Sequence, residues 1–569
     1  MSEQIFDECM YQYAAITFSP VQGFIEKTRK LRDLYGSSII LSYLSQYIAQ
    51  EAKTISGVDV ISPGLINTAQ GMPNRILLKN KETGFDSKKL EQWVRETLLT
   101  AWRKVCDECK KWIEFKLRFV YLNYHWDRDW GLWRTNTWEI FWGSGNTIAE
   151  AMKDLENRKL SRNWTGVNWI GESSSITGTD AIAWPGLGSE SREPKRIDWN
   201  QEEKEIKKFY RHLAFILEGK NPEQQPPDEK PEGKYIDENE KLNIPELIKR
   251  LITLPEIADQ IKDGLLPSEL REKGFTDLSR RPQDNPNGKQ GQWTGWFMGD
   301  GDQVGKFLTE EVEPKRGDEG IHEFSQKMRL WGERFLKEFP KKNMGRIVYA
   351  GGDDFLGLIY NQDFPKDSQD SIPLDQVLKW LKTLHKDWQT DKPEWMQAVT
   401  LSVGFVWAAP SVPQRDVLQH CREAEQQSKR QGRDRLTIRI LFNNGQYVQW
   451  TTPWEYLEIL DHYQDRDGNH NWNHIYNDLA KLKSRHAFSL AYVDTELVLN
   501  KDNKQEFLDD RKALLKFFDC YFEGYEEKLG KAEKLLFKHT TETAYERAKA
   551  MIHWIDDLIT VGWYLSRKI

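Results

Sequence analysis

The segment GRIVYAGGDDFLGLIY, residues 345–360, places the tetrapeptide Gly-Gly-Asp-Asp (351–354) between two apolar runs. A short glycine-rich turn between apolar runs is typical of two antiparallel strands joined by a tight turn. The segment therefore predicts a β-hairpin with strands at 346–350 and 355–360. Two adjacent carboxylates repel each other unless water solvates both or a cation lies between them. The turn is thus either an ordinary exposed turn or half of a metal site.

The sequence around this hairpin predicts alternating strands and helices. Their order is β-α-β-β-α-β-α-β, which contains the ferredoxin-like βαββαβ core. In each element the apolar residues recur at the spacing of a helix or a buried strand. Besides the hairpin, the expected elements are strands at 294–300, 397–408 and 434–441, and helices at 321–339, 377–388 and 415–431.

The N-terminal part of the chain repeats this pattern more faintly. Ser19 and Pro20 stand at the place where the second copy has Asp300 and Asp302. We therefore expect two related α+β domains, of which only the second carries acidic residues at this position. The elements expected in the first copy are a strand at 13–20, a helical stretch from 21 to 52 with one break at a glycine, a strand-turn-strand near 65–79, a helix at 90–115, and a strand at 136–143.

Length and composition predict several domains, because 569 residues are too many for one hydrophobic core. Stretches rich in proline and charge mark the candidate boundaries. We predict an α+β fold with two ferredoxin-like domains at 1–150 and 291–445. Between them we expect a mostly helical domain at 151–290 with a disordered loop near 219–240. Apolar residues spaced three and four apart predict a C-terminal helical domain at 446–569.

The overall charge and the cysteine content exclude several classes of protein. The net charge of −7 argues against a surface that coats nucleic acid, but it leaves room for a local basic groove. The 5 cysteines are sparse and odd in number, as expected of a reduced cytoplasmic protein rather than a disulfide scaffold. No stretch approaches the roughly 18 apolar residues of a membrane span, and the acidic N-terminus does not read as a signal peptide.

The acidic residues of the second copy form a candidate metal site. Asp300 follows the first strand of the expected sheet, and Asp353 and Asp354 lie in the hairpin turn. In a βαββαβ sheet these strands are neighbours, so the three carboxylates would converge and would need a divalent cation. Oxygen ligands favour Mg²⁺ or Mn²⁺, and two such ions about 3.5–4 Å apart form the clamp used for nucleotidyl transfer. The alternative is that Asp-Gly and Gly-Asp serve only as turn formers.

Basic residues and glycines near the acids are candidate phosphate ligands. Lys306 follows the Asp-Gly-Asp loop at the start of an expected helix, and Lys429 and Arg433 lie in the run SKRQGRDR. Gly351 and Gly352 would let a phosphate approach the backbone closely. The alternative for the basic run is a solvated helix terminus that the helix dipole stabilises.

The pair Cys106 and Cys109 forms a lone Cys-x-x-Cys motif on an expected helix. No second pair lies nearby, so buried thiols on a helix face are favoured over a zinc site.

Several stretches together resemble one protein family, the large palm polymerase/cyclase subunit of type III CRISPR effector complexes, and its type III-B branch in particular. That subunit is the cyclic oligoadenylate synthetase of the complex, and its palm also resembles those of the GGDEF diguanylate cyclases. The resemblance covers roughly residues 10–445. The stretches are ITFSPVQGFIEKTRKLRDLYGSSIILSYLS (16–45), GMPNRIL (71–77), EKLNIPELIKRL (240–251), GDGDQVGKFL (299–308), YAGGDDFLGL (349–358) and SKRQGRDRLTI (428–438).

The resemblance implies an RNA-activated nucleotidyltransferase of antiviral defence that makes cyclic 3′–5′ oligoadenylate from ATP with Mg²⁺ or Mn²⁺. It implies two palm domains, with metal ions held in the second one by the three acids. The first palm lacks these acids and would hold the acceptor ATP, for which Ser19, Gln22 and Asn74 are the candidate contacts. The implied partners are other protein subunits, guide RNA and target RNA, with no membrane involved.

Two departures from the family pattern limit what the resemblance implies. Family members often begin with a His-Asp nuclease domain, and none fits before the first palm here, so we expect no DNase activity. The stretch GESSSITGTDAIA (171–183) has serine and threonine where many members have a cysteine zinc motif, so we expect no zinc. Two alternatives stay open: a cyclase that makes another cyclic nucleotide, and a catalytically inactive scaffold subunit. The crowded carboxylates argue against the scaffold.

Overall fold

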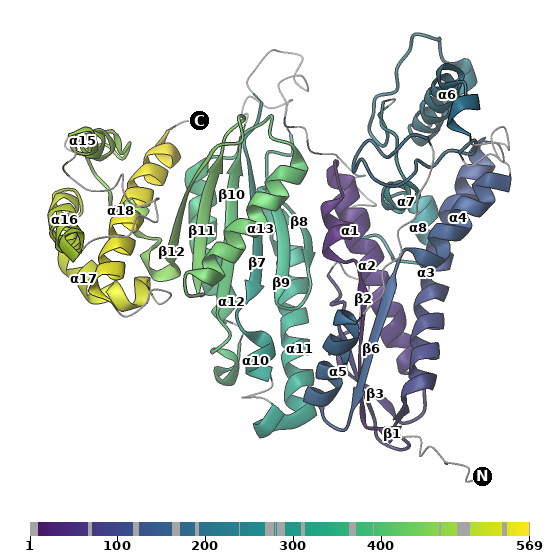
Figure 1. Ribbon diagram of the computed structural model, residues 1–569, viewed down its shortest axis with the longest axis horizontal. Coiled ribbons are helices and arrows are strands. Elements are labelled where there is room, and N and C mark those ends of the chain that lie inside the picture. Colours follow the sequence, from purple (N-terminus) through teal and green to yellow (C-terminus); the bar gives the residue numbers. More distant parts are fainter. Residues whose placement is uncertain are drawn as a thin grey trace. The chain divides into compact units, whose positions relative to one another are not determined.

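The computed structural model divides the chain into two compact units (Figure 1). Unit 1 comprises Met1–Leu278, Leu308–Arg334 and Val348–Gly352, and unit 2 comprises Ser279–Phe307, Phe335–Ile347 and Asp353–Ile569. The structure describes all residues except 1–9, 67–70, 118–123, 162–170, 188–192, 238, 268–277, 279, 281–290, 309–312, 364–370, 391, 466–467, 486, 488–500, 538–542 and 568–569.

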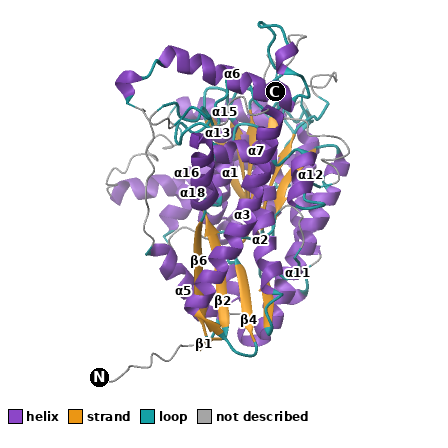
Figure 2. Ribbon diagram, turned by 90° about the vertical axis from the view of Figure 1, so that its right-hand side faces the viewer, coloured by secondary structure: helices purple, strands orange, loops and turns teal. Residues whose placement is uncertain are grey.

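Unit 1 contains a four-stranded antiparallel sheet in the order β3-β4-β2-β6, of which Figure 2 shows β4, β2 and β6 side by side. The predicted strands at 13–20 and 136–143 are confirmed as β2 and β6. The prediction of a strand-turn-strand near 65–79 is half wrong, because its first strand lies earlier in the chain, as β3. The strands are β2 (Tyr13–Ser19), β3 (Val58–Ser62), β4 (Ile76–Asn80) and β6 (Glu139–Gly145).

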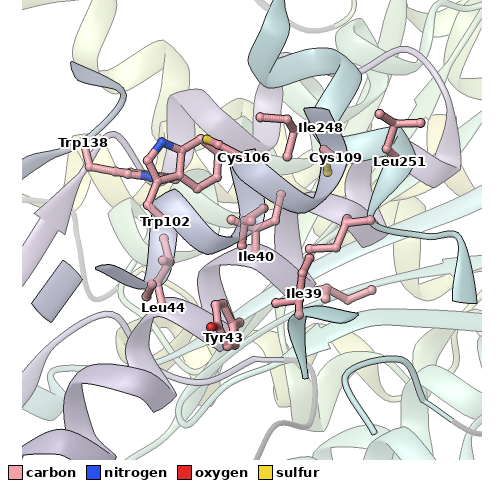
Figure 3. Close-up of a cluster of buried hydrophobic side chains, with 14 of the residues drawn as sticks. Ile39, Ile40, Tyr43, Leu44, Trp102, Cys106, Cys109, Trp138, Ile248 and Leu251 are labelled. Atoms are coloured by element: carbon pink, nitrogen blue, oxygen red, sulfur yellow. The ribbon is translucent and has the colours of Figure 1, made fainter. Parts of the chain in front are cut away.

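Long helices pack around this sheet, and the longest of them carry the core. Helix α2 (Leu31–Ala52) is buried along most of its length, and α3 (Ser87–Leu117) buries one apolar stripe. Figure 3 shows side chains of both helices meeting Ile248 and Leu251. Cys106 and Cys109 lie in this cluster on the buried face of α3, as predicted. Burial raises the pKa of both thiols above the ordinary value.

The first helical stretch has one break, but the break falls at residues 27–30 and not at a glycine as predicted. Helix α1 (Gln22–Glu26) ends before α2 begins at Leu31, and Gly36 lies inside α2 without interrupting it. A Cβ atom at Gly36 would lie 1.8 Å from the carbonyl oxygen of Lys249 in α7 (Ile244–Leu251). The glycine therefore permits two helices to touch, and it does not end one.

The segment 219–240 differs from the disordered loop that we predicted. A guanidinium nitrogen of Arg211 donates to the carbonyl oxygens of Pro226 and Glu229, at 2.6 Å and 3.0 Å. A Glu218 carboxylate accepts hydrogen bonds from the backbone of Glu232 and Gly233. These contacts give residues 226–233 a defined course, because several of their backbone groups find partners on and next to the preceding helix α6 (Trp199–Leu217).

The second sheet has six strands in the order β12-β11-β10-β7-β9-β8. The predicted βαββαβ elements are confirmed, including the hairpin of β8 and β9. The strands are β7 (Thr294–Gly301), β8 (Gly345–Ala350), β9 (Asp354–Ile359), β10 (Leu401–Ala408), β11 (Arg435–Leu441) and β12 (Tyr447–Pro453), and the helices are α10 (Val304–Phe307), α11 (Glu313–Glu338), α12 (Leu374–Thr390) and α13 (Gln414–Arg430).

Strand β12 was not predicted, because residues from 446 onward were expected to be mostly helical. It pairs antiparallel with β11, from Arg435 opposite Pro453 to Leu441 opposite Tyr447. Among the described residues that follow β12, the predicted helices are confirmed as α15 (Asn473–Ser484), α16 (Lys501–Asp519), α17 (Tyr525–Leu536) and α18 (Ala544–Ser566). Within the described residues, no helix is both long and apolar enough to cross a membrane.

Candidate active site

The three acidic residues singled out by the sequence come together at one end of the β7–β9 pair. Asp300 lies directly opposite Asp354 in the antiparallel register. The backbone nitrogen of Gly301 donates a 2.9 Å hydrogen bond to the carbonyl oxygen of Asp353. A Cβ atom at Gly301 would lie only 2.9 Å from the Cβ of Asp353, so the absence of a side chain permits this approach.

The two glycines of the turn have different roles. Gly352 has φ 96°, a left-handed conformation that glycine adopts without strain. Gly351 is buried, and a Cβ atom there would lie 2.2 Å from the carbonyl oxygen of Gly71, which belongs to unit 1 like Gly351 itself. Protein backbone therefore occupies the space that we expected a phosphate to use at Gly351.

A buried arginine fixes this contact between backbone segments of unit 1. Arg329, in α11, donates from one guanidinium nitrogen to the carbonyl oxygens of Gly71 and Ala350, at 2.7 Å and 3.3 Å. The hydroxyl of Ser42 accepts hydrogen bonds from the backbone nitrogens of Gly71 and Met72. The start of the GMPN stretch (71–74) is thus tied to the strand that leads into the Gly-Gly-Asp-Asp turn.

Burial, and for Asp354 also the neighbouring carboxylates, raises the pKa of two acids at this end of the sheet. Burial raises the pKa of Asp300 above its ordinary value, although the neighbouring ammonium of Lys429 opposes the shift. Protein atoms around the carboxyl group, together with the charges of Asp353 and Asp300, raise the pKa of Asp354 well above its ordinary value. Asp354 as a residue is nevertheless exposed, so solvent reaches this end of β9. A cation at this place would favour the ionised forms.

Lys429 already supplies positive charge to the acids. It lies in the last turn of α13, and its ammonium forms ion pairs with Asp300 and with Glu425, the latter at 2.6 Å. Burial would lower the pKa of Lys429, but the two carboxylates outweigh it and raise the pKa above the ordinary value. Glu425 is buried and its own pKa is raised, first by burial. Lys429 is therefore a fixed positive charge beside Asp300.

Asp302, the second acid of the Asp-Gly-Asp loop, has a different environment from Asp300. It is 4% exposed, and both of its carboxylate oxygens are engaged in hydrogen bonds. Oδ1 accepts from the hydroxyl of Ser402 at 2.7 Å, and Oδ2 accepts from the hydroxyl of Thr400 at 2.8 Å. Oδ2 also accepts from the backbone nitrogen of Asp434 at 2.9 Å.

The other predicted phosphate ligands of unit 2 lie on the surface. Lys306 is exposed and belongs to the short helix α10. Arg433 is exposed in the turn between α13 and β11, where it has φ 63°. Both side chains are therefore accessible to an anion from solvent, as a phosphate ligand must be.

The three residues predicted to contact the acceptor nucleotide lie in unit 1 near one end of β2. Ser19 is the last residue of β2, and Gln22 is the exposed first residue of α1. The side-chain amide of Asn74 donates a 3.2 Å hydrogen bond to the hydroxyl of Thr17, a neighbour of Ser19 on the same face of the strand. The predicted trio is therefore grouped around one end of the first sheet.

The acids are not arranged as a complete set of metal ligands. Among the residues that the structure describes, no three His, Cys, Asp or Glu side chains are placed so as to hold a metal ion. The chemistry of the donor set still suits a cation, because Asp300, Asp353 and Asp354 meet at one strand end and the pKa of two of them is raised. Lys429 shows that positive charge is accepted there.

Sequence reasoning missed three residues of this region: Asp302, Glu425 and Arg329. Glu425 stands four residues before Lys429, and this spacing in a helix could have indicated the ion pair. Asp302 was visible in the Asp-Gly-Asp loop, but nothing in the sequence shows which of two acids is buried. Arg329 has no sequence signal, because its partner Gly71 lies 258 residues away and Ala350 lies 21 residues away, both beyond the reach of a local pattern.

Two protein-family models match the chain. The model of the second palm domain of Cas10/Cmr2 matches residues 294–437, and the model of the N-terminal part of the CRISPR-associated protein Cmr2 matches residues 13–107. The first match contains Asp300, Asp353 and Lys429. No curated protein matches the sequence.

Solved structures of type III CRISPR proteins resemble the chain. Type III-B Cmr-beta bound to cognate target RNA gives a TM-score of 0.50 at 12% identity, over 99% of this chain and 84% of that chain. The apo state of type III-B Cmr-beta gives 0.48 at 11% identity, over 98% and 82%. A Csm1–Csm4 cassette in complex with cA4 gives 0.39 at 14% identity, over 100% and 71%. At 12% identity, the likeness to Cmr-beta bound to target RNA supports the fold alone.

Proposed function

Since this chain is a member of the Cas10/Cmr2 family of type III CRISPR large subunits, we propose that it makes cyclic oligoadenylate from ATP. The observation that carries the proposal is the meeting of Asp300, Asp353 and Asp354 at one end of β7 and β9, within the matched palm domain. A scaffold role would not require three carboxylates to meet at one strand end, two of them with a pKa that is raised first by burial.

In this proposal Asp300, Asp353 and Asp354 hold Mg²⁺ or Mn²⁺. Such ions, when bound, lower the pKa of a hydroxyl group and neutralise charge on a triphosphate. The 3′-hydroxyl oxygen of one ATP attacks the α-phosphorus of another, a new phosphodiester bond forms, and the bond to pyrophosphate breaks. The hydroxyl proton passes to solvent. Repetition and ring closure give the cyclic product.

The chain's basic residues orient the donor triphosphate. Lys429 is anchored beside Asp300 and would contact a phosphate oxygen, while Arg433 and Lys306 approach from the surface. Gly352 exposes backbone at the turn, whereas Gly351 serves packing. In unit 1, Ser19, Gln22 and Asn74 would hold the acceptor ATP.

We also propose that the chain works in the cytoplasm as the large subunit of a type III complex with other protein subunits and a guide RNA. The likeness to Cmr-beta bound to cognate target RNA supports this proposal at the level of the fold. Pairing of a target RNA with the guide would then switch on the synthesis.

The test is product analysis by mass spectrometry. The complex, purified with and without target RNA, is incubated with Mg²⁺ or Mn²⁺ and each nucleoside triphosphate in turn, beside an Asp353→Ala/Asp354→Ala control. Cyclic oligoadenylate that forms only with ATP and target RNA, and disappears in the double variant, is the expected result. Formation of a different cyclic nucleotide would contradict the proposed product and identify the chain as a cyclase with another product. Absence of product from an intact, RNA-loaded complex would favour a scaffold role.

A further inference from the structure

Asp302 is buried at the junction of three elements of unit 2. It follows β7 directly, and its backbone nitrogen donates a 2.9 Å hydrogen bond to the carbonyl oxygen of Thr400, just before β10. The hydroxyls of Thr400 and Ser402 and the backbone nitrogen of Asp434 occupy its carboxylate. A carboxylate with both oxygens engaged by buried donors is ill suited to bind a metal ion, and it fixes the groups that it binds.

One of those groups belongs to an unusual turn. Gly432, Arg433 and Asp434 have φ values of 118°, 63° and 53°, so three successive residues adopt positive φ between α13 and β11. For Arg433 and Asp434 this conformation is strained, and it persists only where surrounding contacts hold it. The backbone nitrogen of Arg433 donates to the carbonyl oxygen of Ser428 at 3.1 Å, and the nitrogen of Asp434 donates to Asp302.

The turn carries a predicted phosphate ligand and lies next to another. Arg433 is in its middle, and Lys429 is in the helical turn before it, paired with Asp300. The first and second acids of the Asp-Gly-Asp loop thus contact the same chain segment, residues 429–434. Asp300 contacts a side chain at the end of α13, and Asp302 contacts the backbone after it.

We propose that Asp302 is a positioning residue that holds the turn of Gly432–Asp434, and thereby places Arg433 to bind the triphosphate of ATP. This inference rests on the proposed function and deepens it. It divides the Asp-Gly-Asp loop into an acid that serves the metal site, Asp300, and an acid that serves phosphate recognition indirectly, Asp302. Asp302 acts through Arg433 and does not touch the nucleotide.

The first test is steady-state kinetics of the RNA-loaded complex. Asp302→Asn and Arg433→Gln should each raise the KM for ATP about tenfold while changing kcat by less than about threefold. The KM of the double variant should not exceed the higher KM of the two single variants, because both changes remove the same contact between Arg433 and the triphosphate. Asp375→Asn, an exposed acid in α12, is the control and should leave KM unchanged. Multiplying effects in the double variant would overturn the proposal.

The metal dependence separates the two acids. Asp302→Asn should leave the Mn²⁺ concentration for half-maximal activity within about twofold of wild type, whereas Asp300→Asn should raise it. A large shift in Asp302→Asn would make Asp302 a metal ligand and overturn the proposal. Should Asp302→Asn fail to fold, Thr400→Val removes one of its donors and should raise the KM in the same direction by a smaller factor; an unchanged KM would count against the proposal.

Amide hydrogen exchange tests the anchor without any activity. In the full chain, a peptide that covers residues 431–436 should exchange about tenfold faster in Asp302→Asn than in wild type. Unchanged exchange would overturn the positioning role even if the complex makes cyclic oligoadenylate. Faster exchange in a complex that makes no product would confirm the anchor and count only against the proposed function.

Discussion

Gly36 and Gly131 both lie inside helices, but their surroundings are opposite. A Cβ atom at Gly36 would lie 1.8 Å from the carbonyl oxygen of Lys249, whereas a Cβ atom at Gly131, in α4 (Tyr124–Asn136), would meet nothing within 4 Å. We therefore expect Gly36→Ala to lower the free energy of unfolding by roughly 2–4 kcal/mol, because α2 and α7 must move apart.

Gly131→Ala is the matched control for that substitution. It should be neutral or stabilising by up to about 1 kcal/mol, because alanine is the better helix former. Denaturant unfolding of the three proteins measures both effects. Equal stability of the two variants would show that the contact between α2 and α7 is softer than the distances indicate.

The buried Lys249 should make the free energy of unfolding depend on pH. Its ammonium is buried and donates to the carbonyl oxygens of Phe24 and Lys27, the latter at 3.1 Å. Burial lowers the pKa of Lys249 from 10.5 to about 8, with partial opposition from Asp33 and Glu246. Between these two values the unfolded chain binds more protons than the folded chain, so the free energy of unfolding rises with pH.

The expected gain from pH 7 to pH 9 is about 1 kcal/mol relative to Lys249→Met, which has nothing to titrate at this position. Denaturant unfolding at both pH values, for wild type and variant, measures the difference between the two slopes. Parallel slopes would mean that Lys249 keeps an ordinary pKa in the folded protein.

Among the elements, α11 links two distant segments of unit 1 through Arg329. This guanidinium is 0% exposed and holds the carbonyl oxygens of Gly71 and Ala350. Arg329→Met should lower the free energy of unfolding by roughly 2–3 kcal/mol, because two buried carbonyl groups lose their donor. It should also speed amide exchange in the stretch 71–77.

Lys327→Met is the matched control for Arg329→Met, since Lys327 lies on the same helix but is exposed. It should change stability by less than about 0.5 kcal/mol. Thermal unfolding and hydrogen exchange of both variants provide the comparison. If the two behaved alike, the bonds of Arg329 would contribute nothing net to the fold.

The sequence predicted elements well where the signal is local. The hairpin of β8 and β9 follows from apolar runs around a glycine-rich turn, and the acids at its tip follow from their spacing. Strand β12 was missed although Asn443-Asn444-Gly445 precedes it, a turn signal that a helical reading of the following residues obscured. The role of Gly36 could not be predicted, because the carbonyl oxygen that it approaches lies in α7, about 210 residues away, and long-range contacts leave no local pattern.

At the scale of the whole molecule, neither unit is one continuous piece of chain. Unit 1 takes in Leu308–Arg334 and Val348–Gly352, and Tyr13 accordingly donates from its hydroxyl to the carboxylate of Asp318. Cutting the chain near 290, at the predicted domain boundary, would leave both halves without partners. We expect residues 1–290 and 291–569 each to aggregate when produced alone.

Produced together as two chains, the same halves should form a stable one-to-one complex, because the contacts of unit 1 are restored by association. Size-exclusion chromatography of the two separate and the joint preparations measures this. Two soluble, monomeric halves would show that residues 308–352 are dispensable for unit 1.

The order of its segments along the chain also determines when unit 1 can complete its fold during synthesis. Ribosomes deliver the N-terminal residues first, at roughly 5–20 residues per second, and domains generally fold as they emerge. The first 278 residues cannot complete unit 1 until Val348–Gly352 has been translated. For several seconds the surface of unit 1 that later contacts α11 is therefore exposed on the nascent chain. We expect a chaperone to bind the nascent chain during this interval more than at any other stage.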